Sequence, residues 1–311
     1  ASSRGLGDVY KRQPITTLSM PDTMTQLPKE IDGYPILSLI GEGAFSKIYA
    51  VKDPKTRQLL ALKHVIINDP KKDERWVEQM ESETKIANAL DHPVLRKVLH
   101  FKRQRRWLKS LGAVMLMEFV DGRTLDVIKP DTQETIRIFI HLAQGLQHLE
   151  KQGFVHCDMK PINVLVTSSG DVKIIDLGQA CETGTVKKRI QGTPGYMAPE
   201  QAHRREITPA TDVYNLGATM YWVLCGRVIP TALPPRGQNN GLTTGAVEER
   251  FLKPPTPADE VNRDVPNIVA KTIQEAVEPD PAKRITMSKF LERLEMAQGL
   301  LRSGSGQEFE I

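Results

Sequence analysis

The stretch H-C-D-M-K-P-I-N-V-L, residues 156–165, is followed eleven residues later by D-L-G, residues 176–178. Its chemically active side chains are two carboxylates, one cation and one amide: Asp158, Asp176, Lys160 and Asn163. Transfer of a phosphoryl group from a nucleotide uses such a set, because metal-bound oxygens neutralise the phosphates, a carboxylate orients the acceptor hydroxyl and a cation stabilises the transferring group. We therefore interpret the stretch as the centre of a phosphoryl-transfer site.

Upstream of this stretch the sequence contains a glycine-rich turn, a lysine and a glutamate. The run G-E-G-A-F-S-K-I, residues 41–48, joins two β-rich segments, and its glycines allow backbone N–H groups to approach phosphate oxygens. Taken alone, such a turn is typical of an ordinary hairpin. Lys63 ends the run L-A-L-K, and Glu83 lies on the helical segment that follows. A lysine held by a glutamate presents a fixed charge to nucleotide phosphates, although Glu78 and Glu81 are alternatives for that partner.

Hydrophobic periodicity predicts an α+β fold. Short β-rich runs separated by turns over residues 34–63 predict an antiparallel sheet. A helix-like pattern over 74–90 and a continuous apolar strand over 114–119 follow. Helix-period apolar residues then recur in four later segments: 133–152, 212–225, 265–278 and 286–301. The chain should therefore fold as a small antiparallel β-sheet half with one main helix, followed by a larger and mainly helical half.

Composition restricts the partners that the chain can have. Its 311 residues are 40% hydrophobic, which is enough for a substantial core. The net charge of +4 comes from 42 basic and 38 acidic residues spread along the chain, so we expect no nucleic acid partner. The densest basic run, residues 102–109, is expected to form a solvated hairpin loop rather than a docking site. No apolar stretch reaches the length of a membrane helix, so no membrane segment is expected.

The three cysteines are Cys157, Cys181 and Cys225. They are too few, and too unevenly spaced, for a disulfide framework or a zinc site. This usage fits a reducing compartment, and we expect the protein to be cytoplasmic. The oligomeric state cannot be inferred from the sequence.

Further motifs follow the central stretch in a fixed order. They are G-T-P-G-Y-M-A-P-E at 192–200, D-V-Y-N-L-G at 212–217, and Asp280-Pro281 with Arg284. Together with the earlier motifs, they resemble the eukaryotic-type protein kinase superfamily over roughly residues 31–297. The resemblance implies a bilobal protein kinase-like fold. It also implies transfer of the γ-phosphoryl of ATP to protein hydroxyls, including autophosphorylation, with Mg²⁺ as the metal and Mn²⁺ as an alternative.

The resemblance also assigns roles around the nucleotide. The phosphates would be covered by the glycine-rich turn, formed by Gly41, Glu42, Gly43, Ala44, Phe45 and Ser46. The adenine would lie between Ile48 and Ala61 on one side and Leu165 on the other. Met117 would be the gatekeeper residue, and the backbone from Glu118 to Val120 would be the adenine-binding hinge.

The catalytic roles follow in the same way. Lys63 would hold the α- and β-phosphates through its pair with Glu83. Asp158 would orient the substrate hydroxyl and accept its proton, while Lys160 would stabilise the transferring phosphoryl group. Asn163 and Asp176 would bind Mg²⁺.

Several further features refine the assignment. Lys160-Pro161 and the G-T-P-G-Y segment are forms typical of Ser/Thr kinases, so we expect Ser/Thr acceptors, and Y-M-A-P-E-Q at 196–201 resembles bacterial members. Thr193 is expected to bridge toward the catalytic Asp and Lys. Glu200 and Arg284 would form a buried ion pair, and Asp212 would support the backbone of the catalytic loop. The competing interpretations are a pseudokinase scaffold without turnover and a kinase for small molecules.

Cys157 departs from the family pattern, because many kinases have an arginine there that receives an activation-loop phosphate. We therefore predict that activity does not require phosphorylation of Thr183 or Thr185. For Cys157 itself we favour a packing role over a redox-sensor role. Two smaller departures, Ser46 in place of the third glycine and Leu177 in place of Phe, are expected to be tolerated.

The resemblance sets the expected boundaries. Residues 1–13 are interpreted as a sequencing-adapter artefact, because S-R-G-L-G-D-V-Y-K-R-Q at 3–13 reads as an in-frame translation of a transposon adapter. A flexible lead over 14–30 precedes the kinase domain at 31–297. That domain divides into an N-lobe at 31–117, a hinge at 118–122 and a C-lobe at 123–297. Residues 298–311 would be the end of the last helix and a tail.

Overall fold

The N-terminal half of the chain is a single antiparallel sheet with the order β1-β2-β3-β4-β6-β5. The computed structural model describes residues 27–43, 45–107, 109–232, 246–247 and 254–304. The proposed adapter segment, most of the lead, Ala44 and the last seven residues lie outside these ranges. The strands are β1 Glu30–Ile31, β2 Tyr34–Glu42, β3 Lys47–Lys52, β4 Leu59–Ile66, β5 Val98–Arg106 and β6 Lys109–Glu118.

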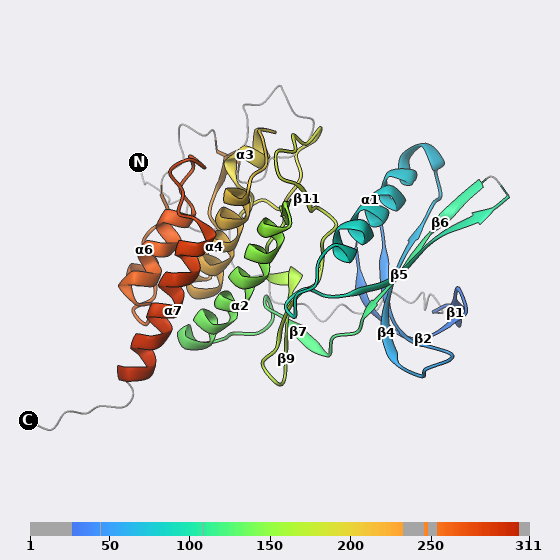
Figure 1. The fold of residues 1–311 in the computed structure, drawn as a ribbon, viewed down its shortest axis with the longest axis horizontal. Helices are drawn as coiled ribbons and strands as arrows, with labels where there is room; N and C mark the ends of the chain where they lie inside the picture. The colour runs from blue at the N-terminus through green and yellow to red at the C-terminus, as the bar shows by residue number, and fades with distance from the viewer. Residues whose placement is uncertain (1–26, 44, 108, 233–245, 248–253, 305–311) are drawn as a thin grey trace, which may run out of the picture.

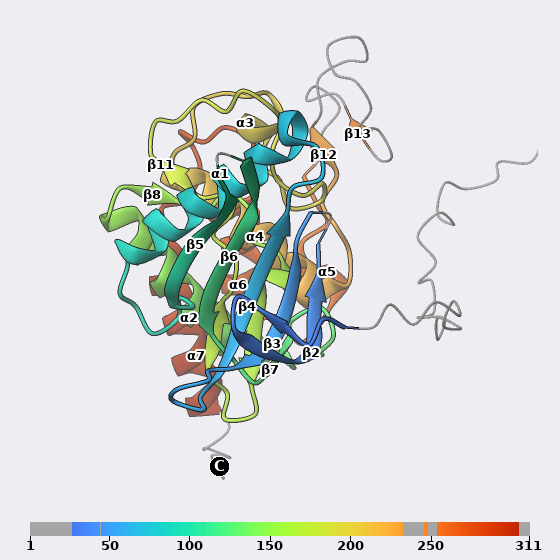
Figure 2. The same cartoon turned by 90° about the vertical axis from the view of Figure 1, so that its right-hand side faces the viewer.

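One helix, α1 Pro70–Asn88, covers one face of this sheet (Figures 1 and 2). Its apolar face packs Val77 and Met80 against Met115 and Met117 of β6. The helix begins four residues before the predicted start. Asp69 caps it by accepting a hydrogen bond from the Lys71 N–H, and a proline at the first helical position favours this start. The apolar period does not extend into this first turn.

The basic run at 102–109 lies at the end of a hairpin, as predicted, but most of it is strand rather than loop. Residues 102–106 end β5 and Lys109 begins β6, while the turn residue Trp107 is exposed. Arg103 lies 2.5 Å from Glu74 and 2.6 Å from Glu81, both on α1. The run therefore helps to hold the sheet against the helix.

The C-terminal half is built mainly from helices, of which α2, α4, α6 and α7 pack around one core (Figure 1). Phe139, Leu142 and Phe290 are among its fully buried side chains. The helices are α2 Thr132–Lys151, η1 Pro161–Asn163, α3 Pro199–Ala202, α4 Pro209–Cys225, α5 Ala258–Val261, α6 Asn267–Ala276 and α7 Met287–Gly304. This arrangement confirms the predicted α+β fold with a sheet-rich and a helical lobe.

Short strands follow the main sheet and flank the predicted site residues of the second half: β7 Gly122–Thr124, β8 Phe154–Val155, β9 Val164–Thr167, β10 Val172–Ile174 and β11 Cys181–Glu182. Two more, β12 Thr231–Ala232 and β13 Ala246–Val247, pair with each other, and β12 contacts α3. β9 pairs with both β7 and β10, and β11 pairs with β8. None of the helices described is long and apolar enough to cross a membrane.

Candidate active site

Three charged side chains from three elements meet beneath the sheet. The Lys63 ammonium on β4 lies 2.7 Å from the carboxylate of Glu83 on α1. It also lies 3.7 Å from the carboxylate of Asp176, in the segment that follows β10. Because Glu83 and Lys63 are largely buried, their charges are poorly screened by water. The three groups therefore form one electrostatic unit.

The pKa values follow from this arrangement. Burial lowers the pKa of Lys63, but the carboxylates of Glu83 and Asp176 outweigh burial and raise it, so the lysine stays charged. Desolvation raises the pKa of Asp176, yet the Lys63 ammonium and the Gly178 N–H outweigh it and lower this pKa to about 2. The Asp176 side chain remains 39% exposed. It therefore offers an ionised and accessible carboxylate.

The catalytic-loop residues form a second hydrogen-bonded unit. Lys160 Nζ lies 2.7 Å from one carboxylate oxygen of Asp158. Thr193 donates to the other oxygen at 2.8 Å and accepts from Lys160 at 2.7 Å. The Asn163 amide donates to the Asp158 carbonyl at 2.9 Å. These contacts therefore fix the relative positions of four residues that the sequence analysis singled out: Asp158, Lys160, Asn163 and Thr193.

The backbone of this loop is held from below by α4 and α3. Asp212 of α4 accepts hydrogen bonds from the N–H groups of His156, at 2.7 Å, and Cys157, at 2.9 Å. Gln201 of α3 donates to the Cys157 carbonyl at 2.6 Å. Cys157 adopts a left-handed conformation with φ of 68°, which these bonds stabilise. The position of Asp158 therefore depends on residues far along the chain.

The predicted adenine residues are divided between the two halves of the molecule. Ile48, Ala61 and Met117 belong to one apolar cluster of the sheet, and Ala61 pairs with Met117 in register. Leu165 is half-buried on β9 in the other half of the molecule. Glu118 ends β6 and pairs with Lys173 of β10 at 2.9 Å. It therefore links the two halves just before Val120, which is half-buried.

The glycine-rich turn is closed by a hydrogen bond from the Gly43 N–H to the Ser46 carbonyl at 2.8 Å. Gly41 pairs with Ile48, and the exposed Glu42 pairs with Lys47 at 3.4 Å. Phe45 stacks on Trp76 of α1, with ring centroids 3.8 Å apart. The turn therefore rests against the helix that carries Glu83. Ala44, also predicted for this site, lies outside the described residues.

Two residues near the site were not predicted from the sequence. Gln79, one helical turn before Glu83, donates to the Gly178 carbonyl at 2.7 Å and so ties α1 to the D-L-G segment. The Arg96 guanidinium donates to the Ile175 carbonyl, next to Asp176. The four-residue spacing of Gln79 and Glu83 was the available signal, because it places both on one helix face.

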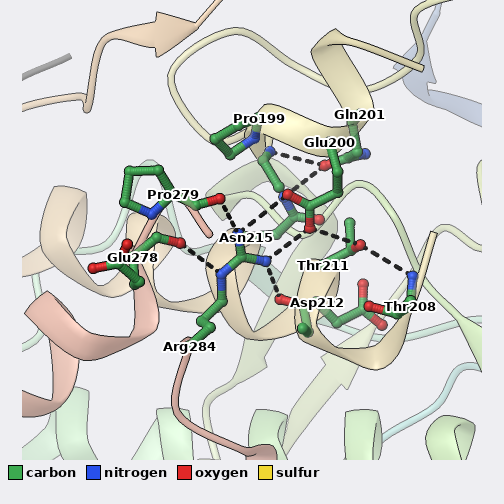
Figure 3. Close-up of polar contacts among 12 residues, drawn as sticks. Pro199, Glu200, Gln201, Thr208, Thr211, Asp212, Asn215, Glu278, Pro279 and Arg284 are labelled. Atoms are coloured by element: carbon green, nitrogen blue, oxygen red, sulfur yellow. Dashed lines mark hydrogen bonds and ion pairs between the residues drawn. The ribbon is translucent and has the colours of Figure 1, made fainter. Parts of the chain in front are cut away.

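The pair expected to brace the C-terminal half is also present (Figure 3). Arg284 Nη1 and Nη2 lie 2.7 and 3.1 Å from the two carboxylate oxygens of Glu200. The remaining guanidinium donors reach the backbone carbonyls of Glu278, Pro279 and Ala210. Both side chains are almost fully buried, at 0% and 2% exposed. This network joins α3 to the segment before α7.

The donor set of the site fits Mg²⁺. Asp176 supplies an ionised carboxylate, and Asn163 supplies an amide oxygen, since its amide nitrogen is engaged by Asp158. Magnesium prefers such oxygen ligands and usually completes its shell with water and substrate phosphates, with only one or two carboxylates from the protein. No cluster of three or more His, Cys, Asp or Glu side chains suited to a metal occurs in the part of the chain that the structure describes.

Two lobes, a lysine–glutamate–aspartate unit and the aspartate of the 156–165 loop are the arrangement that the resemblance predicted. The family model described as the protein kinase domain matches residues 34–294. The chain therefore belongs to the protein kinase domain family.

Its curated relatives are named as serine/threonine-protein kinases. A probable serine/threonine-protein kinase of Clostridium perfringens is 31% identical over 82% of this chain and 37% of its own length. PknB of Mycobacterium leprae is 27% identical over 91% of this chain and 45% of its own length. PrkC of Bacillus subtilis is 27% identical over 85% of this chain and 40% of its own length. The predicted likeness to bacterial Ser/Thr kinases is confirmed, although the chain spans less than half of each of these relatives.

Proposed function

We propose that the chain is an ATP-dependent Ser/Thr protein kinase that works with Mg²⁺, with Mn²⁺ as an alternative. The observation that carries this proposal is the assembly of Asp158, Lys160, Thr193 and Asn163 into one bonded unit. A second unit supports the proposal, in which an ionised Asp176 is paired with Lys63.

In this mechanism Asp158 accepts a hydrogen bond from the substrate hydroxyl and takes its proton as the hydroxyl oxygen attacks. Lys160, 2.7 Å from that carboxylate, stabilises the negative charge on the transferring group. Thr193 holds Asp158 and Lys160 in fixed relative positions through its hydrogen bonds to both. A bound Mg²⁺ would add positive charge at the phosphates, held by Asp176 and Asn163.

Lys63 acts on the other side of the nucleotide. Its ammonium, fixed by Glu83 at 2.7 Å, would bind the α- and β-phosphates without needing to be positioned by the substrate. The Gly41–Ser46 turn would cover the phosphates through its backbone N–H groups. Adenine would lie between Ile48 and Ala61 on one side and Leu165 on the other, next to Met117 and the backbone of residues 118–120.

Protein acceptors with Ser or Thr hydroxyls are favoured by two features. The relatives carry Ser/Thr kinase names, and Thr193 occupies the segment that positions peptides in this family. We further propose that the protein works in the cytoplasm, since the described cysteines are all free thiols.

The test is a transfer assay with purified protein, labelled ATP, Mg²⁺ and a generic basic protein substrate. We expect label on Ser and Thr residues, and we expect the isosteric variant Asp158→Asn to lose it while still binding ATP. ATP binding without transfer by the unmodified protein would instead support the pseudokinase. Repeating the assay with Mn²⁺ in place of Mg²⁺ determines the metal preference.

A further inference from the structure

Two cysteines that are distant in sequence meet beside the catalytic loop. The sulfur atoms of Cys157 and Cys181 lie 3.6 Å apart, and both residues are free thiols. The β8–β11 pairing brings them together, because Cys181 lies opposite Val155 in that ladder. Cys157 immediately precedes Asp158, while Cys181 lies five residues after Asp176. The pair therefore connects the catalytic loop to the segment that follows the D-L-G motif.

The two thiols differ in accessibility. Cys157 is 1% exposed and packs with Val155 and Ile207 in a small apolar cluster. Cys181 lies at the edge of that cluster and is only partly buried. A small oxidant in solution can therefore reach Cys181 first, with Cys157 as the inner partner.

The two thiols also differ in acidity, and the more accessible Cys181 is the more acidic. The pKa of Cys181 is lowered to about 6, first by its hydrogen bond with the Cys157 thiol and then by the nearby Lys187 ammonium, which together outweigh burial. The pKa of Cys157 is raised by that same hydrogen bond, by burial and by the nearby Asp212 carboxylate. Thiolates are the form that peroxides attack, and an accessible thiolate next to a second cysteine is the usual arrangement of redox-sensitive pairs.

We propose that Cys157 and Cys181 form a reversible peroxide-sensitive switch in which a disulfide between them suppresses phosphoryl transfer. The Cys181 thiolate attacks a hydroperoxide and becomes a sulfenic acid, while the peroxide is reduced to water or an alcohol. The Cys157 thiol then attacks the Cys181 sulfur, the S–S bond forms, and the oxygen leaves as water with the thiol proton. A dithiol reductant reverses the reaction by thiol–disulfide exchange.

The expected loss of activity follows from how Cys157 is held, and it rests on the proposed kinase function. Bond formation must shorten the sulfur separation from 3.6 Å by about 1.5 Å. Asp212 and Gln201 hold the backbone of Cys157, so closing the sulfur gap pulls against these contacts and strains the loop that carries Asp158. A displacement of about 1 Å at a reacting group can cost on the order of 100-fold in rate. Oxidation should therefore lower turnover on the order of 10- to 100-fold.

The first measurement does not depend on kinase activity. The reduced full chain is treated with hydrogen peroxide, freed of oxidant, blocked with iodoacetamide and digested without reductant. Mass spectrometry should then find a Cys157–Cys181 cross-linked peptide pair, two hydrogens lighter than the separate peptides. Cys225→Ser is the matched control that keeps the pair, and it should give the same cross-link. If both cysteines are recovered alkylated and without a cross-link, the proposal is overturned.

The second measurement follows phosphate transfer before and after oxidation. Wild type and Cys225→Ser should lose activity and recover it with dithiothreitol. Cys181→Ser, at a partly exposed position, should retain its activity through the same treatment. A cross-link without loss of activity, or equal inactivation of Cys181→Ser, overturns the switch. Absence of transfer before oxidation would count against the proposed kinase function, and the cross-link would still decide whether the pair is redox-active.

Discussion

Replacing Arg284 by Met is expected to destabilise the C-terminal half strongly. The guanidinium of Arg284 uses its donors on Glu200, Glu278, Pro279 and Ala210, as Figure 3 shows in part. Met fills similar space with an apolar side chain but supplies neither charge nor hydrogen bonds. The Glu200 carboxylate would then keep the Thr211 hydroxyl as a donor, at 3.0 Å, while it remains buried without a counter-charge.

The magnitude follows from that burial. Because Glu200 is 2% exposed, water does not screen the loss. Removing one partner of a buried ion pair costs about 3–5 kcal/mol. The total free energy of unfolding of a domain is about 5–15 kcal/mol, so the loss is a large fraction of it. At about 2–4 °C per kcal/mol, the melting temperature should fall by about 6–20 °C.

The assay is unfolding in urea and on heating, followed by tryptophan fluorescence and circular dichroism. Lys283→Met is the matched control, because Lys283 is 74% exposed and its pair with Asp280 is at the surface. Such surface pairs contribute about 0–1 kcal/mol. Adding Glu200→Gln to Arg284→Met should restore part of the loss, because a neutral amide needs no counter-charge. An Arg284→Met variant as stable as Lys283→Met would refute the argument.

Three other predictions follow from the site. Thr193→Val removes hydrogen bonds to two charged groups, each contributing about 1.5–3 kcal/mol, so turnover should fall on the order of 100- to 10,000-fold. Thr193→Ser should stay near wild type, and equal rates of Thr193→Val and the wild type in a steady-state assay would contradict the bridging role. Iodoacetamide reacts with thiolates, and the pKa of Cys181 is lowered to about 6, whereas burial raises the pKa of Cys225 to about 11. Labelling of Cys181 should therefore level off near neutral pH while labelling of Cys225 still rises. Superimposable pH profiles of the two cysteines by mass spectrometry would refute this. A Thr183→Ala, Thr185→Ala double variant should keep its activity, since an uncharged cysteine stands where many kinases carry the phosphate-binding arginine; collapse of catalysis in the transfer assay would sink that expectation.

Local periodicity predicted the types of the main elements better than their ends. The helix expected at 74–90 runs over Pro70–Asn88, because a polar cap and a proline, rather than apolar residues, define its first turn. The basic run at 102–109 was expected to be a loop. Its charges are compatible with a strand because Arg103 pairs with Glu74 and Glu81 of the neighbouring helix. A partner that lies on another element leaves no local signal.

The choice of glutamate beside Lys63 shows the same limit. The sequence left Glu78, Glu81 and Glu83 as candidates on one helix. Successive residues on a helix are rotated by about 100°, so residues two apart point in very different directions. The fold turns Glu83 toward Lys63 and Glu81 toward Arg103. Only the packing of α1 on the sheet decides which carboxylate is buried.

The sequence by itself determined the family of this protein and the chemical groups of its site. Phosphoryl transfer needs specific side chains at nearly fixed spacing, and the segments at 156–165, 176–178 and 192–200 carry them in short local motifs. The tertiary structure alone decided which distant groups meet. Asp212 supports the loop at Cys157, Gln79 reaches Gly178, and Cys181 lies 3.6 Å from Cys157. These contacts join residues between 24 and 99 positions apart, where only the packing of helices and strands sets the distance.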